Sequence, residues 1–570
     1  MALLVTILAV ALAVRLIGIS FGLPYVYYPD EAQIVNHAVA FGTGDLNPHY
    51  FIYPSLFMYV LFIIYCLSYV IGSLAGAFAS TGDFIELFFY DATLFYLPGR
   101  LISCFSGVVS VGIVYFLGSR AYNIRVGLIA AAFLSFSVLH VDYSHYVKTH
   151  VPAGMLVIFG IYLSWSIYNG RDSLRRYIIS GVISGLAASA IYHAGFVIVP
   201  IAVAHILRWY KISKNGLKAN LFSLKIICVP IFSLIAFVLG TPFAILDWHT
   251  FITSLISGGK NFYSGGFWEH GAFYPFTSLL VSMGYPLGIL SLLGLGYALL
   301  RRRPQDLLLL SMPVILGCFL MLFKTKDSLW MLIAFPVLCI ISASLLVDTI
   351  FWIARTRLLQ TVLFPLMTII TLIIPAKASF LNSYKLTLPN TCFLSKEWVE
   401  ENIPPGSKIV MDTGKYYTGK FGPPLSLSRW TLKQFIERGE LVDPNLLYSR
   451  PDGMRPSGNY GEAEYFRQYL NAIGDRPGYD IIQILHDPGA KKAQVLTLDE
   501  YISMGVQYAI VSSEGWGRYF PSKEESLMYP DKAVKYRNFY EELRVRSTLL
   551  KEFNPSSKMQ GPSILIYKIL

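Results

Sequence analysis

Long apolar stretches recur along the first two thirds of the chain, with short polar loops between them. A helix needs about 20 apolar residues to cross the hydrocarbon core of a bilayer. Stretches of roughly this length cover residues 2–22, 98–118, 126–141, 151–167, 223–241, 278–299, 306–323, 329–352 and 359–375. The pattern predicts a polytopic α-helical membrane protein.

Two further apolar segments are interpreted with the help of the charges beside them. Residues 177–209 are too few for two full spans but have basic residues on both flanks, so we expect two short helices that turn near Tyr192, His193 and Gly195. Residues 54–78 are apolar enough to span. A span there would put the later basic loops outside, so we expect an amphipathic or re-entrant segment at the outer surface instead. The result is eleven spans.

Basic residues of the membrane region lie in alternate loops, and basic loops stay in the cytoplasm. The sequence therefore predicts an N-terminus inside and a C-terminus outside. The residues concerned are Arg120, Arg125, Arg171, Arg175, Arg176, Arg208, Lys211, Lys214, Lys218, Lys225, Arg301, Arg302, Arg303, Arg355 and Arg357.

The character of the chain changes after residue 375, where 25 basic and 22 acidic residues gather. Strand-like KIVMD, VQYAIVSS and ILIYKI follow helix-like SKEWVEEN, with Pro- and Gly-rich turns between them. We predict a transmembrane domain over residues 1–375, in which residues 23–97 form the first outer loop with juxtamembrane helices. Residues 376–570 are predicted to be a soluble extracytoplasmic α/β domain.

Composition agrees with a membrane location and excludes several functions. The chain is 54% hydrophobic with a mean hydropathy of +0.52, too apolar for a soluble protein. Its net charge of +11 follows from the basic loops, so we predict no nucleic-acid partner. Of six cysteines only Cys392 lies outside the apolar segments, which argues against disulfides and a cysteine metal site. The first apolar run is expected to be a retained signal anchor in the plasma membrane.

An acidic pair, Asp30 and Glu31, follows the first span in PYVYYPDEAQ, and no Lys or Arg occurs from residue 16 to residue 99. A carboxylate at the mouth of a helix bundle costs less than one placed deeper in the membrane. The pair is the predicted catalytic site. The alternative is that Asp30 only caps the helix that begins at EAQIVNHAVA.

Other polar residues gather at the predicted outer ends of the spans, where the headgroups of anionic lipids lie. Four of them are candidate ligands for a phosphate or, alternatively, side chains that reach toward the interface: Lys148, Arg100, Lys324 and Lys326. Asp142, His145 and His150 suggest a metal, but this spacing does not place them on one helical face. We predict no metal site and no cofactor, with a divalent metal as the alternative.

Five motifs occur in order along the chain: the PDE pair before the Pro-initiated helix YPSLFMYVL, then SHYVKTHVPAGMLVIFGIYL, VLGTPFAILDWHTF, NIPPGSKIVMD and GPSILIYKI. Together they resemble the GT-C glycosyltransferases of the protein mannosyltransferase type, glycosyltransferase family 39 and the related aminoarabinose transferases. The resemblance covers essentially the whole chain.

This resemblance implies that a sugar, a hexose or mannose-like group, passes with inversion from a polyprenyl-phosphate donor to a hydroxyl outside the cytoplasm. Asp30 would be the general base, Glu31 would orient the loop or the acceptor, and cations would hold the phosphate. The partners are then the lipid-linked donor, membrane lipids and an acceptor that is a protein, a lipid or a glycan.

Departures from the family pattern limit how much can be carried over. The chain has His150 where the family often has an acidic residue, Ile191 and Tyr53 where it has lysines, and DSLWMLIAFP where it has Arg-Tyr-Leu-Leu-Pro. Further site residues are therefore expected among His145, His150, Asp142, Tyr53 and His193.

Two other functions are considered. A transporter or flippase of lipid-linked saccharides would need polar groups through the bilayer midplane and usually internal repeats, and neither is found. A non-catalytic scaffold for the C-terminal domain would give no reason for the carboxylate pair.

Overall fold

The structure, a computed structural model, describes residues 1–25, 27–214, 221–263, 274–321, 328–413, 422–440, 467, 469–474, 477–486, 494–520 and 530–569. These residues form two compact units. The helical unit comprises Met1–Ile19, Gly44–Ile63 and Pro98–Tyr384, and the sheet unit comprises Ser20–Thr43, Ile64–Leu97 and Lys385–Leu570.

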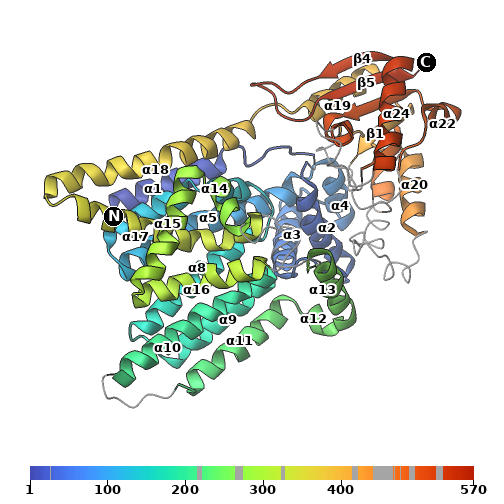
Figure 1. Cartoon of the computed structure of the whole chain (residues 1–570). Helices are drawn as coiled ribbons and strands as arrows, with labels where there is room; N and C mark the ends of the chain where they lie inside the picture. The colour runs from blue at the N-terminus through green and yellow to red at the C-terminus, as the bar shows by residue number, and fades with distance from the viewer. Residues whose placement is uncertain are drawn as a thin grey trace. The chain divides into compact units, whose positions relative to one another are not determined.

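The helical unit consists of long apolar helices that lie side by side (Figure 1). Helix α9 packs on α8 and α11, α10 packs on α8 and α16, and α17 packs on α6 and α15. The helices are α1 (Ala2–Leu16), α5 (Thr93–Ala121), α6 (Ile124–Ser135), α7 (Val138–Asp142), α8 (His150–Tyr168), α9 (Leu174–Ala190), α10 (Ile198–Lys214), α11 (Leu224–Gly240), α12 (Phe243–Leu246), α13 (Trp248–Tyr263), α14 (Tyr274–Ser282), α15 (Tyr285–Arg301), α16 (Pro304–Met321), α17 (Phe335–Ile353) and α18 (Arg357–Lys385), with 3₁₀ turns η2 (Tyr143–His145), η3 (Tyr192–Val197) and η4 (Ser328–Ala334).

Each apolar stretch predicted from the sequence is helical along most of its length. Among the described residues, seven helices are long and apolar enough to cross a membrane, or eight if the bent pair α6 and α7 is one span. Helices α1, α11 and α15 are apolar but shorter. The polytopic helical fold class is confirmed, whereas the number of eleven spans stays a prediction.

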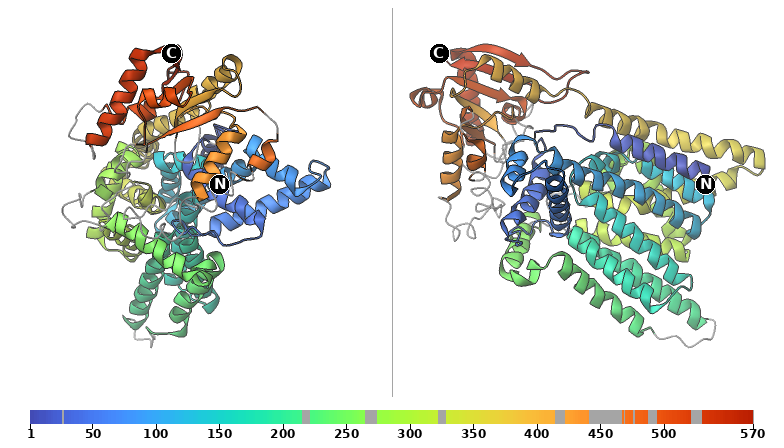
Figure 2. Two further views of the ribbon diagram at one scale, coloured as in Figure 1. Left: turned by 90° about the vertical axis from the view of Figure 1, so that its right-hand side faces the viewer. Right: turned by 180° about the vertical axis from the view of Figure 1, so that it is seen from behind.

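The predicted hairpin over residues 177–209 is present, and a glycine on its first helix, α9, explains how closely that helix packs on α11. Helix α9 ends at Ala190, the chain turns through η3, and α10 returns (Figure 2, right). A Cβ atom added at Gly185 would lie 2.1 Å from the Ser233 carbonyl oxygen on α11. Gly185 therefore lets the backbones of α9 and α11 approach closely, as is usual where helices associate in membranes.

The predicted span over residues 126–141 is broken in the structure. Helices α6 and α7 meet at an angle of 63° around Phe136 and Ser137. The break frees carbonyl groups at the end of α6, and Arg15 of α1 donates to two of them, at Leu134 (3.2 Å) and Ser135 (3.3 Å). A guanidinium with five donors can hold such a break inside an apolar bundle.

Helix α3 (Leu56–Leu74) differs from the expectation for residues 54–78. It is one unbroken helix, which does not fit a re-entrant segment, and it is long and apolar enough to span. Apolar side chains lie on both its buried face, such as Leu61, and its exposed face, such as Leu67 and Ile71. The helix is therefore not amphipathic, and its exposed face suits contact with lipid.

Cysteine labelling tests the predicted topology on both sides of α3. We expect an impermeant thiol reagent on intact cells to label cysteines introduced at the exposed positions Gly42 and Ala79 but not at Ser173 or Lys214. Gly42 is a mild site, because nothing lies within 4 Å of an added Cβ atom. Labelling at only one of Gly42 and Ala79 would mean that α3 crosses the membrane and would overturn the assignment of sides.

The sheet unit holds a five-stranded mixed sheet in the order β2-β1-β3-β5-β4. Strands β1, β2 and β3 are parallel, and β5 is antiparallel to β3 and β4. The elements are α2 (Pro29–Ala40), η1 (Phe41–Thr43), α4 (Thr81–Tyr90), α19 (Thr391–Asn402), β1 (Lys408–Thr413), α20 (Arg429–Glu440), β2 (Asp480–Leu485), α22 (Leu498–Ser503), β3 (Tyr508–Ser512), α23 (Ser513–Trp516), α24 (Pro530–Arg546), β4 (Ser547–Phe553) and β5 (Ile564–Ile569).

Apolar residues cover both faces of this sheet, as in α/β proteins with parallel strands. Ile409 and Met411 of β1 belong to one hydrophobic cluster, and Val410 between them belongs to another. The predicted α/β architecture is thus present. The helix α18 runs through residue 375, where the sequence places the domain boundary, and ends at Lys385.

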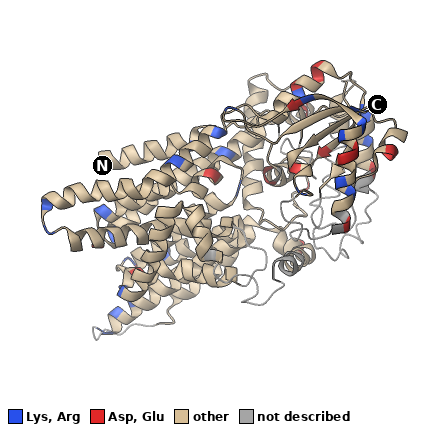
Figure 3. Ribbon diagram, turned by 45° about the horizontal axis from the view of Figure 1, so that its top comes forward, with Lys and Arg blue, Asp and Glu red and all other residues tan. Residues whose placement is uncertain are grey.

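Charged residues are distributed as the sequence pattern implies. Lys, Arg, Asp and Glu are sparse along the helices of the helical unit and dense on the helices and strands of the sheet unit (Figure 3). Several basic residues of the helical unit do more than mark topology. Arg301 pairs with Asp306, which is fully buried, and with Asp348, and it donates to Ser344.

Candidate active site

The acidic pair lies in the first turn of α2. Tyr28 occupies the N-cap and Pro29 the first helical position, so Asp30 is not the cap and the capping alternative is wrong. Carboxylates in a first turn are stabilised by the helix dipole. Asp30 is half-buried, whereas Glu31 is fully buried. The sequence pattern, a polar dipeptide after a Pro, gave no sign of that burial.

Lys148 is buried between η2 and α8, with a side chain that is 1% exposed. Its Nζ atom donates to the Tyr53 hydroxyl (3.3 Å) and lies 5.6 Å from the centre of that ring. Tyr53 is the position at which the resembling aminoarabinose transferases have a lysine. Because the ammonium group is enclosed by protein, Lys148 is not a side chain that reaches for the interface.

Two arginines hold the end of α1 against the rest of the helical unit. Arg100 on α5 is fully buried and donates to the Ile19 carbonyl (3.0 Å). Arg15, also fully buried, donates to Ser144 Oγ (3.2 Å) and His140 Nδ1 (3.1 Å). Sequence reasoning did not single out Arg15, although a lone arginine in an apolar run is itself a signal. Arg15 thus bonds both to the end of α6 and to the segment around His140 and Ser144, which precedes Lys148.

Asp142 and His145 are not assembled into a metal site. The two ring nitrogens of His145 face the carbonyl oxygens of Val141 (3.0 Å) and Ile17 (3.0 Å). Asp142 accepts from the Asn382 amide (3.0 Å). No group of three His, Cys, Asp or Glu side chains suited to a metal occurs in the described part of the chain. Lys324 and Lys326 lie outside the described residues.

His150 and His193 are brought together, although 42 positions separate them in the sequence. Their ring centres are 6.3 Å apart, and both Lys148 and His193 interact electrostatically with His150. Nearby, Tyr192 donates to the Phe51 carbonyl (2.8 Å), which places the turn η3 beside the segment that carries Tyr53. We call Tyr53, Lys148, His150 and His193 the polar cluster.

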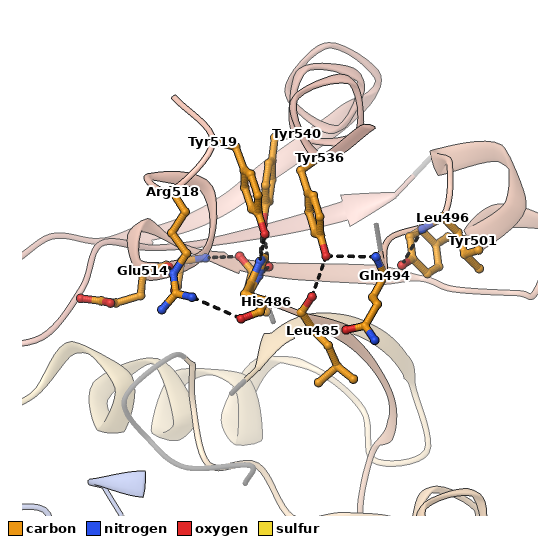
Figure 4. Close-up of polar contacts among 12 residues, drawn as sticks. Leu485, His486, Gln494, Leu496, Tyr501, Glu514, Arg518, Tyr519, Tyr536 and Tyr540 are labelled. Atoms are coloured by element: carbon orange, nitrogen blue, oxygen red, sulfur yellow. Dashed lines mark hydrogen bonds and ion pairs between the residues drawn. The ribbon is translucent and has the colours of Figure 1, made fainter. Parts of the chain in front are cut away.

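A second buried polar group lies at the carboxyl ends of the parallel strands of the sheet unit (Figure 4). Asp412 Oδ1 accepts from His486 Nε2 (2.8 Å) and from the Tyr540 hydroxyl (2.7 Å), and its Oδ2 accepts from the Ser512 amide (2.8 Å). Burial and the Asp412 carboxylate raise the pKa of Tyr540 well above its usual value. Tyr540 therefore stays a proton donor, and the group links strands β1, β2 and β3 to α24.

This second group is expected to support the fold of the sheet unit. Asp412→Ala removes three buried hydrogen bonds, so we expect a loss of about 3 kcal/mol in the free energy of unfolding. Thermal unfolding of the purified full chain measures it. Asp499→Ala, which removes only an exposed pair with Arg546, is the control and should change the midpoint much less. Equal midpoints for the two variants would contradict the assigned role.

Comparisons with known proteins find a family model that matches part of the chain and solved structures that are similar to most of it. Residues 85–238 match the family described as dolichyl-phosphate-mannose-protein mannosyltransferase. The structure of ArnT from Cupriavidus metallidurans bound to undecaprenyl phosphate is similar with a TM-score of 0.50 and 12% identity, over 99% of this chain and 97% of that chain. The apo oligosaccharyltransferase of Archaeoglobus fulgidus is similar with a TM-score of 0.48 and 12% identity, over 91% of this chain and 70% of that chain. The comparison with curated protein sequences finds no match.

The family match and the similarity to ArnT agree with the GT-C resemblance of the sequence motifs. Together with the apolar helices, they indicate an integral membrane protein. The matched residues include Lys148, His150 and His193 but not Asp30 and Glu31.

Proposed function

We propose that this chain, whose residues 85–238 match the dolichyl-phosphate-mannose-protein mannosyltransferase family, is an integral membrane glycosyltransferase. It moves a sugar from a polyprenyl-phosphate donor to a hydroxyl acceptor outside the cytoplasm. The observation that carries the proposal is the buried ammonium group of Lys148, held on Tyr53 inside an apolar helix bundle. A buried ionisable group in a membrane protein is expensive and marks a functional site.

Lys148 is proposed to bind the phosphate of the donor. The phosphate leaves with the electron pair of its bond to the sugar, so negative charge builds up on it as the reaction proceeds. A fixed cation in a low-dielectric site stabilises that charge strongly. The donor is of the kind that the ArnT structure holds, undecaprenyl phosphate, here carrying a sugar.

Asp30 is proposed to be the general base. The acceptor oxygen forms a bond to the anomeric carbon while the bond from that carbon to the phosphate oxygen breaks, and the proton of the hydroxyl passes to the carboxylate. One direct displacement inverts the anomeric configuration. Glu31, one residue later and fully buried, is proposed to set the position of the first turn of α2.

The basic loops support an outward-facing reaction centre, because they keep the opposite ends of the helices in the cytoplasm. The acceptor is therefore a protein, a lipid or a glycan on the outer side.

A panel of lipid-linked sugars tests the proposal. Purified protein is incubated with undecaprenyl- and dolichyl-phosphate derivatives of several hexoses, and loss of sugar from each lipid is measured. At least one donor is expected to be consumed and to leave free polyprenyl phosphate. Intact donors throughout, in the presence of mixed protein, lipid and glycan acceptors, would overturn the proposal.

A further inference from the structure

His150 carries buried polar atoms that the fold does not use. Its side chain is 2% exposed, and neither ring nitrogen has a hydrogen-bond partner among the described residues. A buried polar group without a partner costs free energy, so such groups are rare and call for an explanation. Phenylalanine would fill a similar volume in the core without this cost.

His193 presents a matching unpaired atom. Its ring hydrogen-bonds to the Trp330 backbone, while Nε2 is buried and has no partner in the described part of the chain. A ring that donates to a carbonyl through Nδ1 keeps a lone pair on Nε2. His193 can therefore accept a hydrogen bond from a ligand, and His150 can both accept and donate.

A hydroxyl-bearing ligand suits these two rings. A hydroxyl is at once a donor and an acceptor, so neighbouring hydroxyls of one sugar can bond to both imidazoles, whose centres are 6.3 Å apart. A cationic amino sugar fits less well, because an ammonium group only donates hydrogen bonds, whereas the ring nitrogen of His150 that carries a proton needs an acceptor.

We propose that His150 and His193 bind hydroxyl groups of the donor's sugar and select a neutral polyhydroxylated sugar over an amino sugar. The inference rests on the proposed function, in which Lys148 holds the phosphate to which that sugar is bonded. His150 follows Lys148 by two residues at the start of α8, so a sugar bonded to the phosphate lies within reach of the rings.

Binding to the purified full chain tests the inference with three probes: undecaprenyl phosphate, its mannosyl derivative and its 4-amino-4-deoxy-arabinosyl derivative. We expect the mannosyl lipid to bind about 10-fold more tightly than the bare lipid, as a few hydrogen bonds allow. The amino sugar should not show this gain. His150→Phe and His193→Phe should each remove most of it and leave affinity for undecaprenyl phosphate unchanged.

His205→Phe is the matched control, since this buried imidazole is fully paired, with the Tyr177 hydroxyl (2.7 Å) and the Leu221 carbonyl (2.9 Å). Without ligand, His205→Phe should lower the melting temperature, whereas His150→Phe should leave it unchanged or raise it. The control should keep the preference for the mannosyl lipid.

Three results would overturn the inference. The first is that both His150→Phe and His193→Phe keep the full preference for the mannosyl lipid. The second is that the melting temperature falls as far in His150→Phe as in His205→Phe. The third is that a metal chelator abolishes the preference of the wild-type protein for the mannosyl lipid. Failure of wild-type protein to bind undecaprenyl phosphate would instead remove the proposed function itself. Binding of the bare lipid without any gain from the sugar would refute the inference alone.

Discussion

Asp30→Asn is expected to lower turnover by about two to four orders of magnitude, the usual contribution of a positioned general base. Asparagine keeps the size and polarity of the side chain in the first turn of α2 but cannot accept the acceptor's proton. Donor binding should survive, because the phosphate is proposed to bind at Lys148. Turnover and donor affinity are measured separately on purified protein.

Asp83→Asn is the control for this variant. Asp83 also lies in the first turn of a helix of the sheet unit, α4, where it forms an exposed capping box with Ser80. Its replacement should leave turnover near wild type. Glu31→Gln should cost less turnover than Asp30→Asn, although the full burial of Glu31 makes a check of folding necessary. Near-normal turnover in Asp30→Asn with an inactive Glu31→Gln would reverse the two roles, and if both stay active, Asp142 is the next carboxylate to test.

Lys148→Met should weaken binding of the lipid-phosphate donor by about 10- to 100-fold, the loss expected for one charge-assisted hydrogen bond. Methionine fills a similar volume, so the packing of the segment before α8 should persist. Donor affinity is measured with the variant in detergent and compared with thermal stability, which should change little.

Lys211→Met provides a closely matched control. The Lys211 Nζ atom lies 5.2 Å from the centre of the Tyr168 ring, much as Lys148 lies over Tyr53, but Lys211 is exposed at the end of α10. Its replacement should leave donor affinity unchanged. If both lysine variants bind the donor equally well, Lys148 is not part of the site.

The sequence predicted the general architecture because periodic hydrophobicity and turn residues decide it locally. Both the membrane helices and the α/β sheet follow from such patterns, and the five motifs that indicated the mannosyltransferase type agree with the family match over residues 85–238. Local patterns could not show the contacts between residues that are far apart in the sequence. At the break between α6 and α7, two carbonyl groups accept hydrogen bonds from Arg15, which lies more than 100 residues earlier.

The candidate site was predicted as a set of residue types rather than as an arrangement. Local chemistry singled out Lys148, Arg100 and the acidic pair as candidates, but it could not show that Lys148 is enclosed against Tyr53 or that Arg100 bonds to the end of α1. The approach of His150 to His193 depends on how the turn η3 packs against α8, which no single segment encodes.

Sugar transfer and transport of the intact donor are distinguished most directly in sealed vesicles. Purified protein is reconstituted with a labelled donor that the enzyme consumes and with an acceptor, and free polyprenyl phosphate is measured together with glycosylated product. The account predicts one polyprenyl phosphate released for each sugar transferred in wild type, and almost none in Asp30→Asn. Movement of intact donor across the vesicle membrane, with neither free lipid phosphate nor product formed, would contradict it.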